Sequence, residues 1–467
     1  MSTFGTLNTA VTGLLASQRA MDTAGQNVVN ANTPGYSRQR VLLSAIGATP
    51  SASLHTGGKN PVGGVQVDGV IRIRDAFLEA TRAAAGSRHQ ALSAQESTLS
   101  TTELLLAEPG PTGLQAGLDS FYAAWHELSL SPTDSASGSV VIERGGGLTD
   151  QLHTVGNGIA NEWSSARTRL QQVVDQTNQA AEDLATLNTQ IAAGTTAGRP
   201  VNELMDQRDT LVRKLADLIG GYAVPGQDGA VSVSVNGITL VSGSTAQTLT
   251  LTGAGDIDNA VSSPPTITWG SVAVPVESGA AAGYLSALRT DLPNLSASVD
   301  AVAVALRDAV NTVHTSGFTL AGAAGGAFFS GTTARNIAVV PTTPGQLAVA
   351  GSAGTVDGSV ARQIGELSSD TTVSTVLGGT DGPSALWRKA ATGLGTQLQS
   401  LKAAVAAQGS VLDAAEDAVN SDAGVNLDEE MTGMLLFQRA YQASARVIST
   451  IDEMLDTLIN RTGTVGR

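Results

Sequence analysis

The chain contains no cysteine, and this absence excludes disulfides, thiolate metal ligands and thiol nucleophiles. Aromatic residues are scarce, at 3% of 467 residues, and charged residues make up only 14%. Apolar residues nevertheless account for 42%, which is enough to fill several hydrophobic cores. We therefore expect a folded protein of roughly two to four domains, held together by packing rather than by cross-links.

Positive charge is also deficient, because 26 Lys and Arg against 41 Asp and Glu leave a net charge of -15. No basic cluster is present to displace counterions from an anionic backbone, so we expect no nucleic-acid partner. No run of about 18 consecutive apolar residues occurs, so we expect no membrane insertion. The first eighteen residues carry no side-chain charge, and their apolar residues are spaced. We therefore expect no cleavable secretory signal.

Motifs for catalysis and for cofactor binding are missing from the sequence. Neither the serine-hydrolase elbow G-x-S-x-G nor the phosphate-binding G-x-x-x-x-G-K-[S/T] occurs. The glycine run 145–147 has no preceding strand and no following lysine, so we interpret it as a linker between helices. Asp256, Asp258 and Asn259 begin like a calcium loop but lack the later Gly and Glu, which favours a solvated turn. We predict that the protein is not an enzyme and binds no cofactor.

Metal binding is not predicted either. The sequence has five widely separated histidines, namely His55, His89, His126, His153 and His314. None lies at metal-ligand spacing from another histidine or from a motif carboxylate. We interpret them as surface or packing residues.

The strongest positive pattern lies at the two ends of the chain, where apolar residues recur at alternating spacings of four and three. This spacing is the heptad seam of a helix that packs against partner helices. The N-terminal seam, in a predicted helix at residues 4–31, contains Leu7, Val11, Leu14, Met21 and Val28. The C-terminal seam contains Met434, Phe437, Tyr441, Ile448, Ile451, Leu455 and Leu458. Asn426 and Glu429 resemble a capping box at the start of the second helix, and Gly463 lies beyond its last apolar residue.

Between the ends, helical periodicity alternates with strand-like segments. Helices are predicted at residues 75–107, 158–193, 201–219, 284–315 and 384–420. Residues 221–283 have a period of two instead, with a tight hairpin turn at Asn236 and Gly237. Residues 317–383 are rich in Gly, Ser and Thr, and we interpret them as strand and loop, with strands at 337–340 and 346–349.

These segments are nested, which predicts a mostly α fold with inserted β structure. The predicted architecture has terminal coiled-coil helices that pair the two ends, a bundle of long helices, and small outer β domains. The terminal helical assembly domain would comprise residues 1–50 plus 424–467. The bundle would comprise 51–220 plus 284–316 plus 384–423, with β insertions at 221–283 and, less regularly, at 317–383. Because a lone helix is marginal in water, we expect the terminal helices to find partners in other subunits.

The segment NVVNANTPGYSRQRV, residues 27–41, closely resembles the N-terminal signature of the bacterial flagellar rod, hook and hook-associated protein family. Its turn contains Asn32, Thr33, Pro34, Gly35 and Tyr36. The C-terminal segment GVNLDEEMTGMLLFQRAYQASARVISTIDEMLDTLINR, residues 424–461, is similar to the C-terminal helix of the same family. The internal segments NELMDQRDTLVRKLADLI and VNTVHTSGFTLAGAAGGAFF resemble the hook-associated members more than the rod and hook subunits.

The resemblance implies a structural subunit that is secreted through the flagellar type III pathway and self-assembles at the distal end of the hook, where hook and filament meet. It also implies four partners: further copies of the chain, hook protein, a second junction protein, and a cytosolic export chaperone at the C-terminal helix. We hypothesise that the twelve apolar seam residues named above form the assembly interface and become ordered on assembly.

Other functions were weighed against this one. The first alternative is another axial subunit, a rod or hook protein, which would have the same ends. A type III secreted effector is disfavoured by the missing motifs and the missing apolar span. A peptidoglycan hydrolase would need two acidic residues paired in a cleft, and the sequence indicates no such pair.

Overall fold

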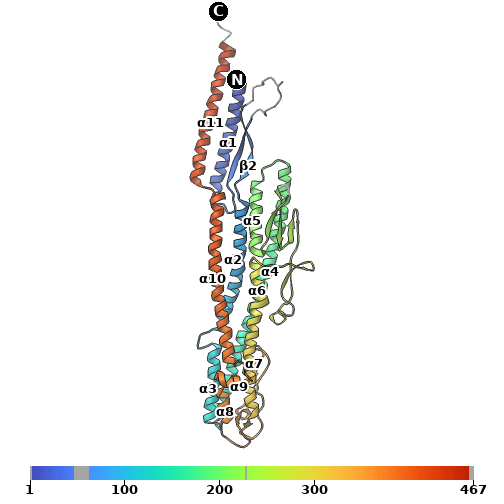
Figure 1. The fold of residues 1–467 in the computed structure, drawn as a ribbon, viewed down its shortest axis with the longest axis vertical. Coiled ribbons are helices and arrows are strands. Elements are labelled where there is room, and N and C mark those ends of the chain that lie inside the picture. Colours follow the sequence, from blue (N-terminus) through green and yellow to red (C-terminus); the bar gives the residue numbers. More distant parts are fainter. Residues whose placement is uncertain (1–2, 47–62, 227–228, 462–467) are drawn as a thin grey trace, which may run out of the picture.

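The computed structural model describes residues 3–46, 63–226 and 229–461. The molecule is long and narrow, and the two ends of the chain lie close together at one end of it (Figure 1). His55, Gly463 and the domain boundary expected at residue 50 lie outside the described residues. No described helix is long and apolar enough to cross a membrane.

Long helices form most of the structure. The α-helices are α1 (Thr3–Asn30), α2 (Ala76–Leu106), α3 (Leu114–Leu130), α4 (Ser135–Thr196), α5 (Asn202–Ile219), α6 (Ala280–Ser286), α7 (Leu292–Ser316), α8 (Ser359–Glu366), α9 (Asp370–Val376), α10 (Pro383–Ala423) and α11 (Leu427–Asp456). Short π-helical turns at Ala287–Asp291 and Thr457–Arg461 extend α6 into α7 and extend α11. Every helix that periodicity predicted is present.

The strands are short and all of their pairings are antiparallel. They are β1 (Gln39–Ala45), β2 (Val65–Arg72), β3 (Tyr222–Pro225), β4 (Val231–Val235), β5 (Ile238–Ser242), β6 (Thr245–Ala246), β7 (Thr250–Thr252), β8 (Thr266–Trp269), β9 (Val272–Ala273), β10 (Phe318–Thr319), β11 (Phe329–Ser330), β12 (Ala338–Val339) and β13 (Ala348–Ala350). The predicted insertion folds into two sheets, β3-β4-β5-β6 and β7-β8-β9. Asn236 and Gly237 both have positive φ, as the predicted hairpin turn requires.

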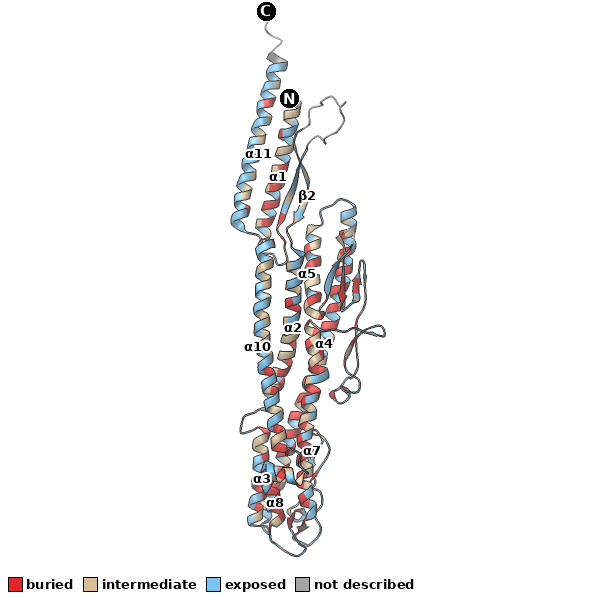
Figure 2. Ribbon diagram, viewed as in Figure 1, coloured by how far each residue is buried: buried red, intermediate tan, exposed pale blue. Residues whose placement is uncertain are grey.

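One contiguous hydrophobic core runs through the bundle and its β insertions. It extends in sequence from Leu99 to Leu398 and contains no residue of α1 or α11. Trp163 of α4 lies at its centre, fully buried, and its indole N–H donates to the Leu288 carbonyl at 2.9 Å. Figure 2 shows the same division, because buried residues concentrate on α4, α7 and α3, whereas α11 is largely exposed.

The prediction for residues 145–147 was wrong, because this glycine run lies inside α4. The helix begins at Ser135, where the Asp134 carboxylate accepts hydrogen bonds from the amides of Ala136 and Ser137. Gly145 is buried against Phe328, and a Cβ at this position would lie 3.1 Å from the aromatic ring. Glycine is therefore present because α4 passes close to an aromatic side chain, not because the chain must bend.

The end of the bundle remote from the termini is built around aromatic residues that the periodicity did not single out. Phe121 and Trp125 of α3 pack on Phe328 with ring centroids 5.6 and 5.4 Å apart. The strands expected at 337–340 and 346–349 are present as β12 and β13. The same region also contains α8 and α9, which the prediction of strand and loop missed. Helices of seven or eight residues are too short for periodicity to reveal.

The hairpin of β1 and β2 packs on α1, so the structure places β2 with the terminal helices. The sequence had assigned residues 51–72 to the bundle instead. That division overlooked the pairing of β2 with β1, which only the folded chain reveals.

Buried His314, at the end of α7, generates a prediction about pH. Its Nδ1 is 2.7 Å from the Gly326 carbonyl oxygen, and its Nε2 accepts from the Ala348 amide at 2.9 Å. This pairing requires a neutral ring that carries its proton on Nδ1. Burial lowers the pKa of His314 below its ordinary value of 6.5, so the unfolded chain binds a proton first as pH falls.

We therefore expect the protein to lose stability as pH falls below about 6.5, by up to about 1.4 kcal/mol for each pH unit until the folded pKa is reached. The free energy of unfolding should be measured by urea denaturation between pH 5 and 8, on the protein and on His314→Gln. The variant keeps a donor and an acceptor but cannot titrate. Parallel pH dependence in the two proteins would contradict the prediction.

Candidate assembly domain

The terminal helices pair with each other within one chain. α1 and α11 run antiparallel, side by side, and α11 continues beyond α10 away from the bundle (Figure 1). Their backbones approach closely at Gly13, where a Cβ would lie 3.2 Å from the Ser444 hydroxyl. The expectation that each helix finds its partner only in other subunits is therefore wrong for this structure.

Most of the predicted seam residues lie between the two helices. Ile451 is buried, at 5% exposure. Those that are half-buried are Leu7, Leu14, Met21, Val28, Met434, Phe437, Tyr441, Ile448 and Leu455. Val11 and Leu458 are exposed, at 38% and 56%. The heptad pattern thus identifies an intramolecular seam, and its role in assembly stays a prediction.

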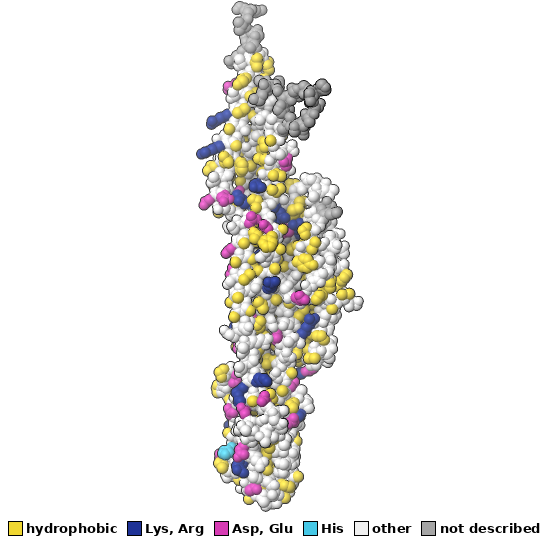
Figure 3. Space-filling model, in the orientation of Figure 1, with side chains coloured by type: hydrophobic (Ala, Val, Ile, Leu, Met, Phe, Trp, Pro, Cys, Tyr) yellow, Lys and Arg dark blue, Asp and Glu magenta, His cyan; other side chains and the backbone are white. Residues whose placement is uncertain are grey.

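A second set of apolar residues, which the sequence analysis did not select, faces solvent on the same helices. It comprises Leu15 and Val29 of α1 and Leu427, Met431, Leu435, Leu436, Val447 and Met454 of α11. Leu436 is 63% exposed and Val29 is 81% exposed. Figure 3 shows hydrophobic side chains at the surface along this part of the molecule. The signal available in the sequence was a stripe of apolar residues outside the seam, where a solvated helix pair is normally polar.

The family-signature turn closes the end of α1. The Thr33 amide donates to the Asn30 carbonyl at 2.9 Å, and the Tyr36 amide donates to the Thr33 carbonyl at 3.1 Å. Asn32, Thr33 and Pro34 are exposed. Gly35 has φ of +83°, and a Cβ there would lie 2.6 Å from the Thr210 hydroxyl of α5. Glycine is required at this position both by the backbone conformation and by the close approach of α5.

Asn27 connects this turn to both terminal helices. The residue is 1% exposed, and its carboxamide oxygen accepts from the Tyr36 hydroxyl at 2.8 Å and from the Gln39 amide at 2.9 Å. Its amide nitrogen donates to the Gln39 carbonyl at 2.9 Å and to a Glu430 carboxylate oxygen at 3.0 Å. Burial, with Asp206 and Glu430 nearby, raises the pKa of Tyr36 to about 12, so the hydroxyl stays protonated and can donate at neutral pH.

Arg38 extends this network into α11. Its guanidinium donates to Glu430 at 2.6 Å and to Glu429 at 3.0 Å, and its amide donates to the Ala423 carbonyl at 3.1 Å. Glu430 is buried at the first turn of α11, so the negative carboxylate also lies at the positive end of that helix. The predicted cap is present, with Asn426 accepting from the amides of Asp428 and Glu429.

A second group of charges attaches the terminal region to the bundle. Asp206 of α5 accepts from the Ser37 amide at 3.3 Å and from Arg72 at 2.7 Å. Arg72 also binds Asp209 at 2.8 Å, and Asn202 donates to the Val70 carbonyl at 2.9 Å. These side chains are largely buried, and removing one partner from a buried ion pair typically costs about 3–5 kcal/mol. We name the network of Asn27, Tyr36, Arg38, Asp206 and Glu430 the joint.

The described residues offer no alternative site with chemistry. They contain no group of three or more His, Asp or Glu residues that could hold a metal ion. Asp256 caps a short 3-10 turn by accepting from the Asn259 amide, in place of starting a calcium loop.

Comparison with protein families matches three parts of the chain. A model described as the flagellar hook-associated protein FlgK helical domain matches residues 99–329. A flagella basal body rod protein model matches residues 7–36, and a flagellar basal body rod FlgEFG protein C-terminal model matches residues 419–461. The two rod-type matches cover the helices of the assembly domain, and the third covers much of the bundle.

Individual relatives agree with these matches. Flagellar hook-associated protein 1 of Bacillus subtilis (strain 168) is 30% identical over 509 residues, which covers all of both chains. Flagellar hook-associated protein 1 of Escherichia coli (strain K12) is 25% identical, over 97% of this chain and 99% of the relative. The solved structure of the flagellar hook junction protein FlgK from Burkholderia pseudomallei has a similar fold, with a TM-score of 0.64 at 15% identity. It covers 74% of this chain and 99% of the other.

The full-length match at 30% identity, together with the helical-domain match and the paired terminal helices, shows that the chain belongs to the flagellar hook-associated protein 1 family, a structural family of the bacterial flagellum.

Proposed function

We propose that the chain is a structural subunit of the junction between hook and filament, located at the distal end of the hook and assembled with further copies of itself through the exposed faces of α1 and α11. The observation that carries this proposal is the apolar stripe on these two helices. Leu435, Leu436 and Val447 are between 43% and 63% exposed although their helix is already paired. Contiguous apolar surface of this kind marks an interaction site in a soluble protein.

The separation of the hydrophobic core supports the same proposal. Because no residue of α1 or α11 belongs to the core cluster, the terminal helices contribute little to the folding of the bundle. They are held to it by the polar joint instead. Such a region is suited to complete its burial against neighbouring subunits, and we propose that assembly orders it further.

We further propose that hook protein lies on one side of the assembled subunits, that a second junction protein lies on the other, and that a cytosolic export chaperone covers α11 before secretion. The exposed apolar face of α11 supports the chaperone, since such a face would otherwise associate with other apolar surfaces in the cytosol.

A rod or hook subunit is the second candidate, because the models that match residues 7–36 and 419–461 are those of rod proteins. The terminal helices therefore do not discriminate between positions along the flagellar axis. The helical-domain match at residues 99–329 favours the junction.

Electron microscopy of cells that lack the gene tests this position. We expect complete hooks without filaments, and filament subunit lost to the medium, because the platform for the filament would be absent. Missing hooks would assign the protein to the rod or hook, and normal filaments would exclude a role in the axis.

Charged substitutions distinguish the intramolecular seam from the outer face. We expect Val447→Asp on the outer face to abolish incorporation into hooks while α1 and α11 stay paired. Ile451→Asp should abolish incorporation as well, but by separating the two helices, since it places a charge at a buried position at a cost of about 2–5 kcal/mol.

Incorporation should be scored by immunoelectron microscopy, and the fold of the bundle by thermal unfolding followed by circular dichroism. Gln442→Glu, an exposed and already polar position on α11, is the matched control and should incorporate normally. Normal incorporation of Val447→Asp would refute the assembly role of the outer face.

A further inference from the structure

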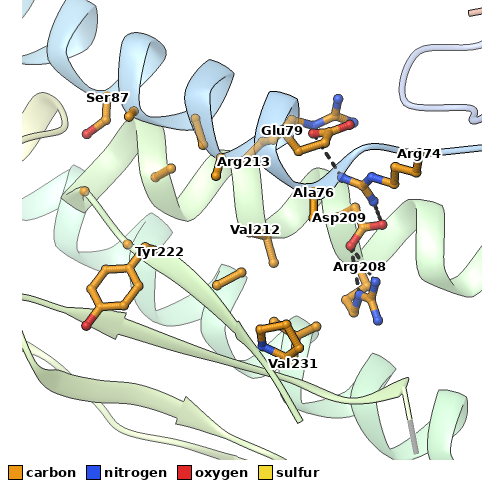
Figure 4. Close-up of a pocket in the computed structure, with 18 of the residues that line it drawn as sticks. Arg74, Ala76, Glu79, Ser87, Arg208, Asp209, Val212, Arg213, Tyr222 and Val231 are labelled. Atoms are coloured by element: carbon orange, nitrogen blue, oxygen red, sulfur yellow. Dashed lines mark hydrogen bonds and ion pairs between the residues drawn. The ribbon is translucent and has the colours of Figure 1, made fainter. Parts of the chain in front are cut away.

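An open groove lies on the bundle just below the joint, between α2, α5 and β3 (Figure 4). Its volume is about 610 Å³. Small side chains form its walls, namely Ala76, Ala80, Ala83, Ala84, Ala216 and Ala223. Ala76, Ala80 and Ala84 are exposed one helical turn apart along α2. The groove can therefore accept large apolar side chains arranged at helical spacing.

The charge of the groove is opposite to that of the chain as a whole. Five arginines line it, Arg72, Arg74, Arg88, Arg208 and Arg213, against only Glu79 and Asp209. The chain overall carries 41 acidic and 26 basic residues. A positively charged groove on a protein of net charge -15 is complementary to the remainder of its own surface.

Part of this positive charge is not neutralised within the chain. Arg72, Arg74 and Arg208 all bind the single carboxylate of Asp209. Burial lowers the pKa of Arg208 to about 10, and the adjacent Arg72 and Arg74 add to the effect. Arg213 forms no ion pair in the described part of the chain, and donates to the Thr210 hydroxyl at 3.2 Å.

The first turns of α11 carry the complementary features. Leu427, Met431 and Leu435 are exposed by 48%, 50% and 55% at spacings of four residues, and Asp428 lies beside them. From Leu427 to Leu435 a helix rises about 12 Å, the same rise as from Ala76 to Ala84 along α2. We name these three apolar residues the α11 edge.

The α11 edge cannot enter the groove of its own chain. α11 begins at the joint and runs away from the bundle, whereas the groove extends along α2 in the opposite direction (Figure 1). Any α11 edge that occupies the groove must come from another molecule.

We propose that the groove receives the α11 edge of a second copy of this chain, with Leu435 near Ala84 and Asp428 near Arg213. The contact is heterologous, since each copy offers its edge to one neighbour and its groove to another, and such contacts build rings or helical arrays. The inference rests on the proposed function in that copies must lie next to one another in the axis.

The absence of cysteine makes cross-linking a clean test, because every thiol is then introduced by design. Ala84→Cys and Leu435→Cys would be placed on two differently tagged full-length chains, expressed together, and oxidised in isolated hooks. We expect a disulfide-linked dimer carrying both tags. The matched control pairs Leu435→Cys with Ala414→Cys, an exposed alanine on α10 away from the groove, and should give none.

A charge exchange tests the polar part of the contact in the same cross-linking pair. Arg213→Glu should reduce the cross-linked fraction about two- to fivefold, the range for an exposed ion pair. Adding Asp428→Arg should restore it. Loss without rescue would mean that Arg213 acts only on the fold of its own chain, and would overturn the pairing of these two residues.

Tyr222→p-benzoylphenylalanine at the rim of the groove identifies the occupant directly. After irradiation of isolated hooks, mass spectrometry should find an adduct with residues of α11 from a second copy. An adduct with another protein, equal disulfide formation in the Ala414 control, or tagged chains that incorporate without any cross-link would each overturn the proposal. Failure of the wild-type chain to incorporate into hooks would instead overturn the proposed function.

Discussion

The buried carboxamide of Asn27 is the interaction on which the terminal region depends. One side chain accepts hydrogen bonds from the turn after α1 and donates to Glu430 at the start of α11, so it fixes both ends of the chain in one place. Burying a polar group without partners would cost roughly 1–3 kcal/mol, and here each polar atom of the amide is paired. Asn27 therefore specifies the geometry of the assembly domain more than it stabilises the protein as a whole.

This polar joint explains how the molecule combines two regions of different character. The bundle has a continuous hydrophobic core that excludes the terminal helices. α1 and α11 form a single layer of two helices, which buries only one face of each and leaves Leu436 and Val447 in solvent. A two-helix layer cannot cover all of its apolar surface by itself. Its incomplete burial and its capacity to assemble thus have the same physical origin.

Predictions from the sequence succeeded where a local pattern determines structure. The seam that includes Leu14 and Ile451 indicated paired terminal helices, and Asn236 with Gly237 indicated a hairpin, because helix period and turn conformation depend on residues close in sequence. The same reasoning failed at Gly145, since a glycine in contact with Phe328 nearly two hundred residues away cannot be distinguished locally from a glycine in a linker.

The sequence by itself determined that this protein is mostly helical, that it lacks the residues for thiol chemistry, and that its two ends resemble the flagellar axial family. Only the tertiary structure decided which partner each apolar face has. It pairs the heptad seams within one chain and exposes Met431 and Leu435. It also brings Asp206 to the signature turn and Arg213 to the groove. The physical reason is that periodicity reports which face of a helix is apolar, whereas burial depends on segments hundreds of residues apart, whose meeting no local pattern encodes.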